Sequence, residues 1–163
     1  MSFNKEIFEL NPDIVHIGSL VLSNNITKSS ILKIIKYFKS KNSLISFDIN
    51  YRDDIFSNIK VFSDLINYVD ILKMSLDELF LYTNKNDILE ACKLIARNNQ
   101  IIVITLGSKG SFYYLNDEFE IVSSINVNTI DTTGAGDSFF GAFLYKYNEL
   151  LKNKKIITKK DFK

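Results

Sequence analysis

The stretch DTTGAGDSFFGAF, residues 131–143, concentrates the residue types that chemistry on an anion requires, with three of the chain's six glycines. Gly134, Ala135 and Gly136 precede an apolar helical pattern, so they offer unhindered backbone N–H groups at a helix N-terminus, where a phosphate binds well. The carboxylate of Asp137 would repel such an anion, so it needs another purpose. Accepting a proton from an attacking hydroxyl during phosphoryl transfer is one such purpose.

An ordinary capped helix is the competing interpretation of this stretch. Asp131 or Thr133 could cap the first turn, and the glycines could serve close packing. For an isolated G-x-G-D that interpretation would be the better one. The Asp-Thr-Thr before the glycines and the Ser-Phe after them favour the phosphate interpretation.

Apolar strand-like runs alternate with helical patterns along the rest of the chain, and these elements must position the chemistry. Strands are expected at 13–22, where the run should be buried, and at 43–50, 70–75 and 101–107. Helices are expected after a cap at Thr27 or Ser29, at 61–69, from near Ser75, and at 87–99. The alternation predicts parallel strands with crossover helices, an α/β sheet covered on both faces.

Apolar residues at helical spacing define the inner faces of two of these helices. The predicted inner faces are Ile31, Leu32, Ile34, Ile35 and Phe38 in the first, and Ile88, Leu89, Cys92, Leu94 and Ile95 in the second.

The segment 111–122, SFYYLNDEFEIV, alternates around an Asn-Asp pair and predicts a hairpin at the edge of the sheet. In open parallel sheets, ligands lie beyond the carboxyl ends of the strands. Polar residues follow the apolar runs at 18–19, 48–52, 73–75, 105–107 and 131–134.

The 163 residues are 46% hydrophobic and 24% charged, which is typical of one folded domain. A net charge of +1 gives no reason to expect a nucleic acid or an anionic membrane as partner. No run approaches the ~18 apolar residues of a membrane span and no secretory signal pattern is present, so a cytoplasmic location is expected. The single cysteine, Cys92, excludes an internal disulfide and should serve packing.

Several stretches resemble, in the same order, motifs of the ribokinase-like (PfkB) family of carbohydrate kinases. Besides residues 131–143, they are HIGSLVLS (16–23), FDINYRDDIF (47–56), VDILKMSLDELFLYT (69–83) and IIVITLGSKGSFYY (101–114). FDINYR is similar to the FDPNYR segment of fructokinases and ketodeoxygluconate kinases, with Ile49 where proline is usual. The resemblance covers about residues 11–151. It implies an α/β ribokinase-like fold with a mostly parallel sheet and helices on both faces.

The same resemblance implies ATP-dependent phosphorylation of a sugar hydroxyl. Asp137 falls on the catalytic base, and the amides of Gly134, Ala135 and Gly136 fall on an anion hole for the transferring phosphoryl group. FDINYR and KMSLDEL favour fructose as the sugar, with 2-keto-3-deoxygluconate next.

The resemblance also implies roles for individual residues, and several of these residues have a purely structural explanation as well. Arg52 falls near the substrate but could pair with Asp53 or Asp54, and Glu78 falls on a residue that orders Mg²⁺ through water but would also suit a helix dipole. Asp131 and Thr133 lie where some members bind K⁺. Residues that the resemblance places at the nucleotide are Asn50, Arg52, Lys73, Ser75, Thr105, Gly107 and Gly110. The TLGSKG segment taken alone is only a turn, and Lys73 alone could lie in solvent.

Residues 1–163 are interpreted as one partial kinase domain. Family members are roughly twice as long, and the N-terminal sugar-binding and lid part and the C-terminal part around adenine are missing. The chain could be a fragment of an active sugar kinase, a non-catalytic nucleotide-binding module such as half of a split enzyme, or a ligand-free structural remnant. ATP and a small sugar are the expected partners, and an exposed sheet edge could support a homo-oligomer. No P-loop or G-x-G-x-x-G motif follows a strand, which disfavours other nucleotide folds.

Overall fold

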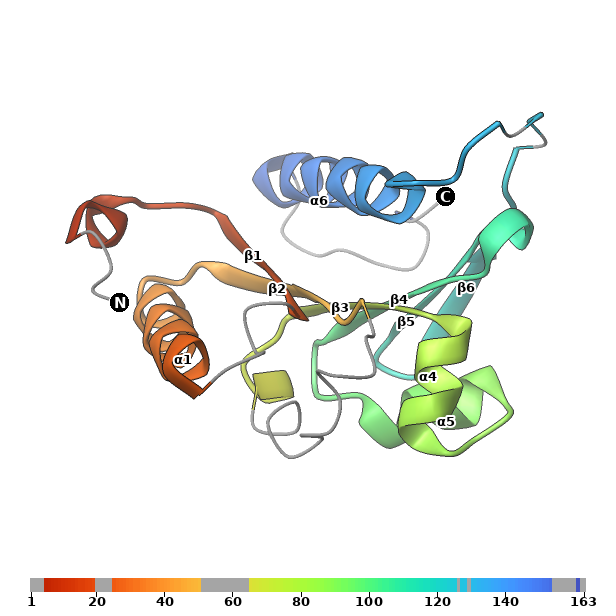
Figure 1. The fold of residues 1–163 in the computed structure, drawn as a ribbon, viewed down its shortest axis with the longest axis horizontal. Coiled ribbons are helices and arrows are strands. Elements are labelled where there is room, and N and C mark those ends of the chain that lie inside the picture. The colour runs from red at the N-terminus through yellow and green to blue at the C-terminus, as the bar shows by residue number, and fades with distance from the viewer. Residues whose placement is uncertain are drawn as a thin grey trace. The chain divides into compact units, whose positions relative to one another are not determined.

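The computed structural model describes residues 5–19, 25–50, 65–125, 127–128, 130–153 and 161. Its six strands form one mixed sheet in the order β1-β2-β3-β4-β5-β6 (Figure 1). The strands are β1 (Ile14–Gly18), β2 (Leu44–Asp48), β3 (Ile71–Ser75), β4 (Ile101–Thr105), β5 (Ser111–Leu115) and β6 (Glu118–Val122). The chain divides into two compact units, Met1–Leu72 and Lys73–Lys163, which are described separately.

The first unit contains a 3-10 turn, η1 (Lys5–Glu9), and the helix α1 (Asn25–Ser40), which lies between β1 and β2 in the sequence. β1 runs parallel to β2, as the crossover pattern predicts, with Ile14 opposite Leu44. Asp70 ties β2 to the segment that leads into β3, because its carboxylate accepts hydrogen bonds from the amide of Ile45 and the ammonium of Lys39, both at 2.7 Å.

Two details of the first unit differ from the sequence-based expectation. α1 begins at Asn25, so Thr27 and Ser29 lie inside the helix and do not cap it. β1 is not a buried strand, since only Ile17 of its five residues is buried. Among the described strands it stands at the end of the order, beside β2. Of the predicted inner face of α1, Ile34, Ile35 and Phe38 are buried.

The predicted helix at 61–69 falls partly outside the described residues. Residues 65–66 are helical and 67–68 form a turn, while 61–64 are not described.

The second unit ends its sheet with the predicted hairpin, because β4, β5 and β6 pair antiparallel in sequence order. Asn116 and Asp117 form the two-residue turn with φ of 48° and 65°, the left-handed pair that matches strand twist. Asn99 contacts this turn through both its side chain and its backbone. Oδ1 of Asn99 accepts a hydrogen bond from Nδ2 of Asn116 at 3.0 Å, and the backbone amide of Asn99 donates one to Oδ1 of Asn116 at 2.9 Å.

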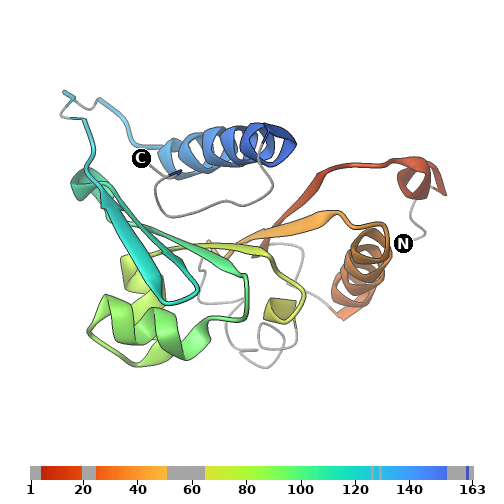
Figure 2. The ribbon, with the colours of Figure 1, turned by 180° about the vertical axis from the view of Figure 1, so that it is seen from behind.

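Helices flank this part of the sheet on opposite sides. In both views, α6 (Ala135–Asn153) lies on one side of the hairpin strands, and α4 (Leu76–Thr83) and α5 (Ile88–Ile95) lie on the other (Figures 1 and 2). α6 buries Phe140, and its Phe143 ring stacks on Tyr113 of β5 with centroids 5.6 Å apart. Among the described residues, no helix is long and apolar enough to cross a bilayer.

α5 follows its predicted pattern in part. Cys92 and Ile95 are buried, but Leu94 is 58% exposed and does not belong to the inner face. The helix also ends at Ile95, short of the expected 99, because Ala96 leaves the helical region with ψ of 144°. The guanidinium of Arg97 donates to the carbonyl of Ile95 at 2.9 Å and so caps this end.

Candidate active site

Ser75 and Glu78 lie together where β3 becomes α4. The hydroxyl of Ser75 accepts a hydrogen bond from the Glu78 amide at 3.2 Å, and Oε2 of Glu78 accepts one from the Ser75 amide at 2.6 Å. This is a capping box, and it confirms the prediction that a helix begins near Ser75. One oxygen of the Glu78 carboxylate therefore has a structural role.

The turn after β4 contains Thr105, Gly107 and Gly110, and its backbone requires both glycines. Gly107 and Gly110 have φ of 60° and 109°, where side chains are strained. The turn, which includes η3 (Gly107–Lys109), is closed by a 2.8 Å hydrogen bond from the Leu106 amide to the Gly110 carbonyl. A Cβ on Gly110 would lie 2.0 Å from the Val122 carbonyl oxygen, so the turn packs directly on the end of β6.

The segment before α6 is arranged around Asp131 and Gly134. Oδ1 of Asp131 accepts hydrogen bonds from the amide and the hydroxyl of Thr133, both at 2.8 Å. These bonds, the amide's above all, lower the pKa of the Asp131 carboxyl. Gly134 has φ of 74°, and its carbonyl accepts the first intrahelical bond of α6 from the Ser138 amide at 2.9 Å.

Gly134 is therefore the N-cap of α6, and it has no side chain with which to cap the next amides. The Ala135 amide donates to the Thr132 carbonyl at 3.0 Å. Of the three predicted anion-hole amides, that of Ala135 is thus engaged within the turn. Asp137 is exposed in the first turn of the helix.

Lys73 of β3 reaches this helix start. Its side chain is buried, with the residue 8% exposed, and its Nζ lies 3.4 Å from the position that a Cβ would take on Gly136. The structure therefore brings the predicted nucleotide residue Lys73 beside the predicted anion hole, and the lysine does not lie in solvent.

Asn50 belongs to the first unit. It has φ of 40°, and its carbonyl accepts a 3.0 Å hydrogen bond from the buried hydroxyl of Ser19. Arg52 lies outside the described residues. His16, the only histidine, has its Nδ1 3.1 Å from the Ser46 hydroxyl. Among the described residues, no three His, Cys, Asp or Glu side chains gather as a metal site would require.

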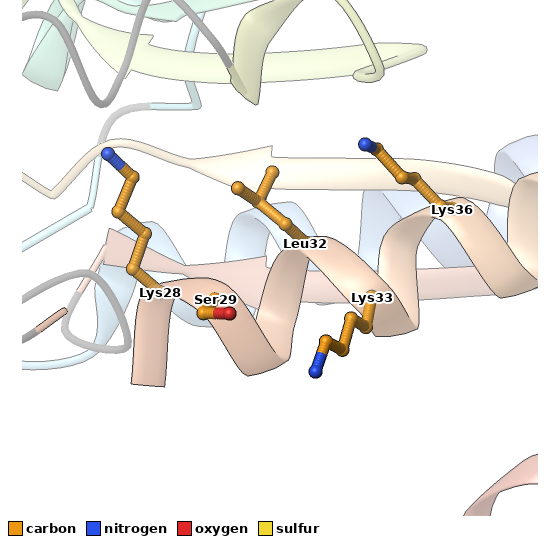
Figure 3. A pocket seen from close by; sticks show the side chains of 5 residues that line it. All are labelled: Lys28, Ser29, Leu32, Lys33 and Lys36. Atoms are coloured by element: carbon orange, nitrogen blue, oxygen red, sulfur yellow. The ribbon is translucent and has the colours of Figure 1, made fainter. Parts of the chain in front are cut away.

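A shallow hollow of about 340 Å³ lies along α1. None of the predicted site residues that the structure describes lines it. Figure 3 shows Lys28, Leu32 and Lys36 extending from one side of the helix and Lys33 from the other. Ser29 completes the lining.

Sequence reasoning missed Ser124, which follows β6. Its hydroxyl donates to the carbonyl of Ser108 in the turn after β4. A serine in a polar coil carries no sequence signal for such a contact.

Comparison with known proteins places the chain in a family. The sequence model of the family described as "pfkB family carbohydrate kinase" matches residues 4–158 of the chain. A fructokinase of Vibrio alginolyticus is 34% identical over 81% of this chain and 45% of its own length. A fructokinase from Vibrio cholerae O395, crystallised with fructose, ADP and calcium ion, is 32% identical, with a TM-score of 0.74 over 82% of this chain and 45% of its own.

An uncharacterized sugar kinase from Pyrococcus horikoshii, crystallised with ATP, is 35% identical, with a TM-score of 0.72 over 89% of this chain and 46% of its own. The chain thus spans less than half the length of each of these three proteins. Its α/β architecture is the one found in fructokinases and ribokinase-like kinases. With the family match extending over nearly all of its residues, the chain belongs to the pfkB family of carbohydrate kinases.

Proposed function

We propose that this chain carries the phosphoryl-transfer part of a cytoplasmic, ATP-dependent sugar kinase of the fructokinase type. The observation that carries the proposal is the position of the Lys73 ammonium beside the first turn of α6. That turn begins on Gly134, so its first amides receive no cap from the N-cap side chain.

The electrostatics of this point favour a bound phosphate. The N-terminus of a helix carries partial positive charge, and a largely buried ammonium adds a full one. Both groups attract an anion, and the helix start is open to one because Gly134 and Ala135 are exposed. A phosphate would accept hydrogen bonds from both groups, and such charge-assisted bonds are stronger than neutral ones.

Asp137 supplies the base in this proposal. Its carboxylate takes the proton of the sugar hydroxyl, and the hydroxyl oxygen then bonds to the γ-phosphorus of ATP. The bond from the γ-phosphorus to the bridging oxygen breaks, and ADP leaves with that electron pair. Lys73 and the amides at Gly134–Gly136 offset the charge on the transferring group. The amide of Ala135 would have to exchange its Thr132 partner to take part.

The other predicted residues receive supporting roles. We infer that Lys73, Ser75 and the turn with Thr105, Gly107 and Gly110 contact the nucleotide, together with Asn50 and Arg52. The Glu78 carboxylate is an oxygen ligand of the kind Mg²⁺ prefers, and it would act through water. Asp131 and Thr133 are the candidates for K⁺. Structural neighbours crystallised with fructose and ADP, and with ATP, support these two classes of substrate.

The half-length match favours a second candidate. Phosphoryl transfer depends on positioning two substrates and excluding water. A chain that spans less than half of its relatives could bind nucleotide without turning over sugar, as a module or as one half of a split kinase.

Two measurements test the proposal. Addition of ATP with magnesium should raise the melting temperature of the chain, because a ligand that binds the folded state stabilises it. Phosphorylation of fructose should then be assayed for the chain and for Asp137→Asn, with Asp77→Asn as control, because Asp77 is also an exposed first-turn aspartate. Loss of a general base should lower kcat roughly 10²- to 10⁴-fold and leave ATP binding intact.

The outcomes separate the candidates. Phosphorylation that Asp137→Asn abolishes and Asp77→Asn retains supports the kinase. ATP binding without phosphorylation supports the nucleotide-binding module. No stabilisation by ATP at any concentration would contradict both, and the ligand-free remnant would be the remaining interpretation.

A further inference from the structure

Ser124 connects two segments that are distant in the sequence. Its hydroxyl donates a hydrogen bond to the carbonyl of Ser108, which lies in the turn between β4 and β5. Ser124 itself lies two residues beyond Val122, the last residue of β6. The contact therefore fixes the turn to the segment that leads from β6 towards Gly134.

A second, independent observation shows how tightly these segments meet. A Cβ on Gly110 would lie 2.0 Å from the Val122 carbonyl oxygen and 2.8 Å from the Ser124 amide nitrogen. Only glycine permits this approach of the two backbones. The turn is thus held at Gly110 by close packing and at Ser108 by the Ser124 hydroxyl.

The turn also has hydrogen bonds of its own. The amides of Leu106, Lys109 and Gly110 donate to carbonyls within the turn, at 2.8, 3.2 and 3.1 Å. Gly107, Ser108 and Lys109 are exposed. Exposed turns are in general more mobile than the strands they connect, so a hydrogen bond from outside the turn restricts its motion.

We propose that Ser124 is a positioning residue for the nucleotide-binding turn, and this rests on the proposed function of that turn. The Ser124 hydroxyl holds the Ser108 carbonyl, and so keeps Thr105, Gly107 and Gly110 in one arrangement before ATP arrives. Pre-arranged contacts bind more tightly because less ordering accompanies binding. Ser124 itself does not touch the reacting atoms.

The test uses two substitutions of nearly equal shape. Ser124→Thr keeps the hydroxyl and Ser124→Val replaces it with a methyl group, and β-branched residues suit extended backbone. Binding of ATP with magnesium is measured by calorimetry for the unaltered chain and both variants. Ser123→Ala, an exposed neighbour, is the matched control. Ser124→Val should weaken ATP binding about three- to tenfold, while Ser124→Thr and Ser123→Ala should not.

Hydrogen exchange without nucleotide provides a readout that a general loss of stability would not reproduce. In Ser124→Val, the amides of Leu106, Lys109 and Gly110 should exchange faster, while those of β4 and β5 keep their rates. If Ser124→Val phosphorylates sugar, its KM for ATP should be higher than that of the unaltered chain, while kcat and the KM for sugar should not change.

The outcomes divide cleanly between the two proposals. If the unaltered chain binds ATP and the Val and Thr variants bind it equally well, Ser124 does not position the turn and the proposed function stands. If exchange accelerates throughout the sheet, Ser124 serves the whole fold, and the positioning role is overturned. If the unaltered chain binds no ATP, the proposed function fails, and this inference fails with it.

Discussion

The ammonium of Lys73, in the middle of β3, lies 3.4 Å from the point where Gly136, at the start of α6, would carry a Cβ. Any residue larger than glycine at 136 would contact this charge. The two residues thus form one local unit, although more than half of the second unit of the chain separates them in the sequence.

Replacing Lys73 with methionine should weaken ATP binding roughly 10- to 100-fold, because a hydrogen bond from a charged donor contributes about 1.5–3 kcal/mol. Titration calorimetry with ATP and magnesium checks this. Lys85→Met is the matched control, since Lys85 is exposed and pairs with Glu90 on the surface. If Lys73→Met and Lys85→Met bind ATP with equal affinity, Lys73 does not contribute to nucleotide binding.

Gly110→Ala should lower the free energy of unfolding by roughly 2–4 kcal/mol, because φ is 109° and the methyl group would meet the Val122 carbonyl. Gly141→Ala is the control within α6, where nothing lies within 4 Å of the added carbon. There the helix should gain about 0.5–1 kcal/mol. Urea denaturation measures both changes, and a tolerated Gly110→Ala would show that the turn can move away from β6.

Substitutions of Glu78 separate its helix-capping role from a role near magnesium. Glu78→Gln can still accept the bond from the Ser75 amide and should keep most of the stability, whereas Glu78→Ala should cost about 1 kcal/mol. If Glu78 also orders Mg²⁺, Glu78→Gln should weaken ATP binding in magnesium and leave the magnesium-free affinity unchanged.

Glu90→Gln is the control for this experiment, because Glu90 also lies in the first turn of its helix and is exposed. If magnesium changes the ATP affinity of Glu78→Gln and of Glu90→Gln by the same factor, Glu78 has no role near magnesium and serves only in the capping box.

Cys92 should make the chain less stable in alkali. Burial, and secondly the charge of Asp87, raise the pKa of the Cys92 thiol from 9.0 to about 12. The unfolded thiol therefore ionises first, and stability is lost as pH rises from about 9 towards 12. One proton changes the free energy of unfolding by about 1.4 kcal/mol per pH unit.

Denaturation between pH 8 and 11 checks this against Cys92→Ala, which should show a shallower loss. Parallel slopes for the two proteins would mean that the thiol ionises as easily in the folded chain as in the unfolded one.

Sequence patterns predicted those elements whose signals are local. The β-branched run at 101–105 became β4, and the Asn-Asp pair became the hairpin turn, since both depend on residues that are adjacent in the chain. The start of α4 was also predictable, because a capping box spans only four residues.

Other features depend on distant neighbours and could not be predicted. Leu94 has helical spacing but is exposed, because which apolar residues are buried depends on what the helix packs against. The expected burial of β1 failed for the same reason, since β1 stands at the end of the order of the described strands. The proximity of Lys73 to Gly136 and the Ser124 contact join segments that no periodic pattern relates.

The glycine at the N-cap of α6 has no side chain with which to cap the helix. A phosphate held by the Gly136 and Asp137 amides would supply the acceptor that a serine or aspartate supplies elsewhere. The bound anion would then stabilise the first turn of α6, and that turn would in return hold the anion in place. The first turn of the helix would therefore be more stable with ligand than without it. Substrate would thus complete the secondary structure of the site that binds it.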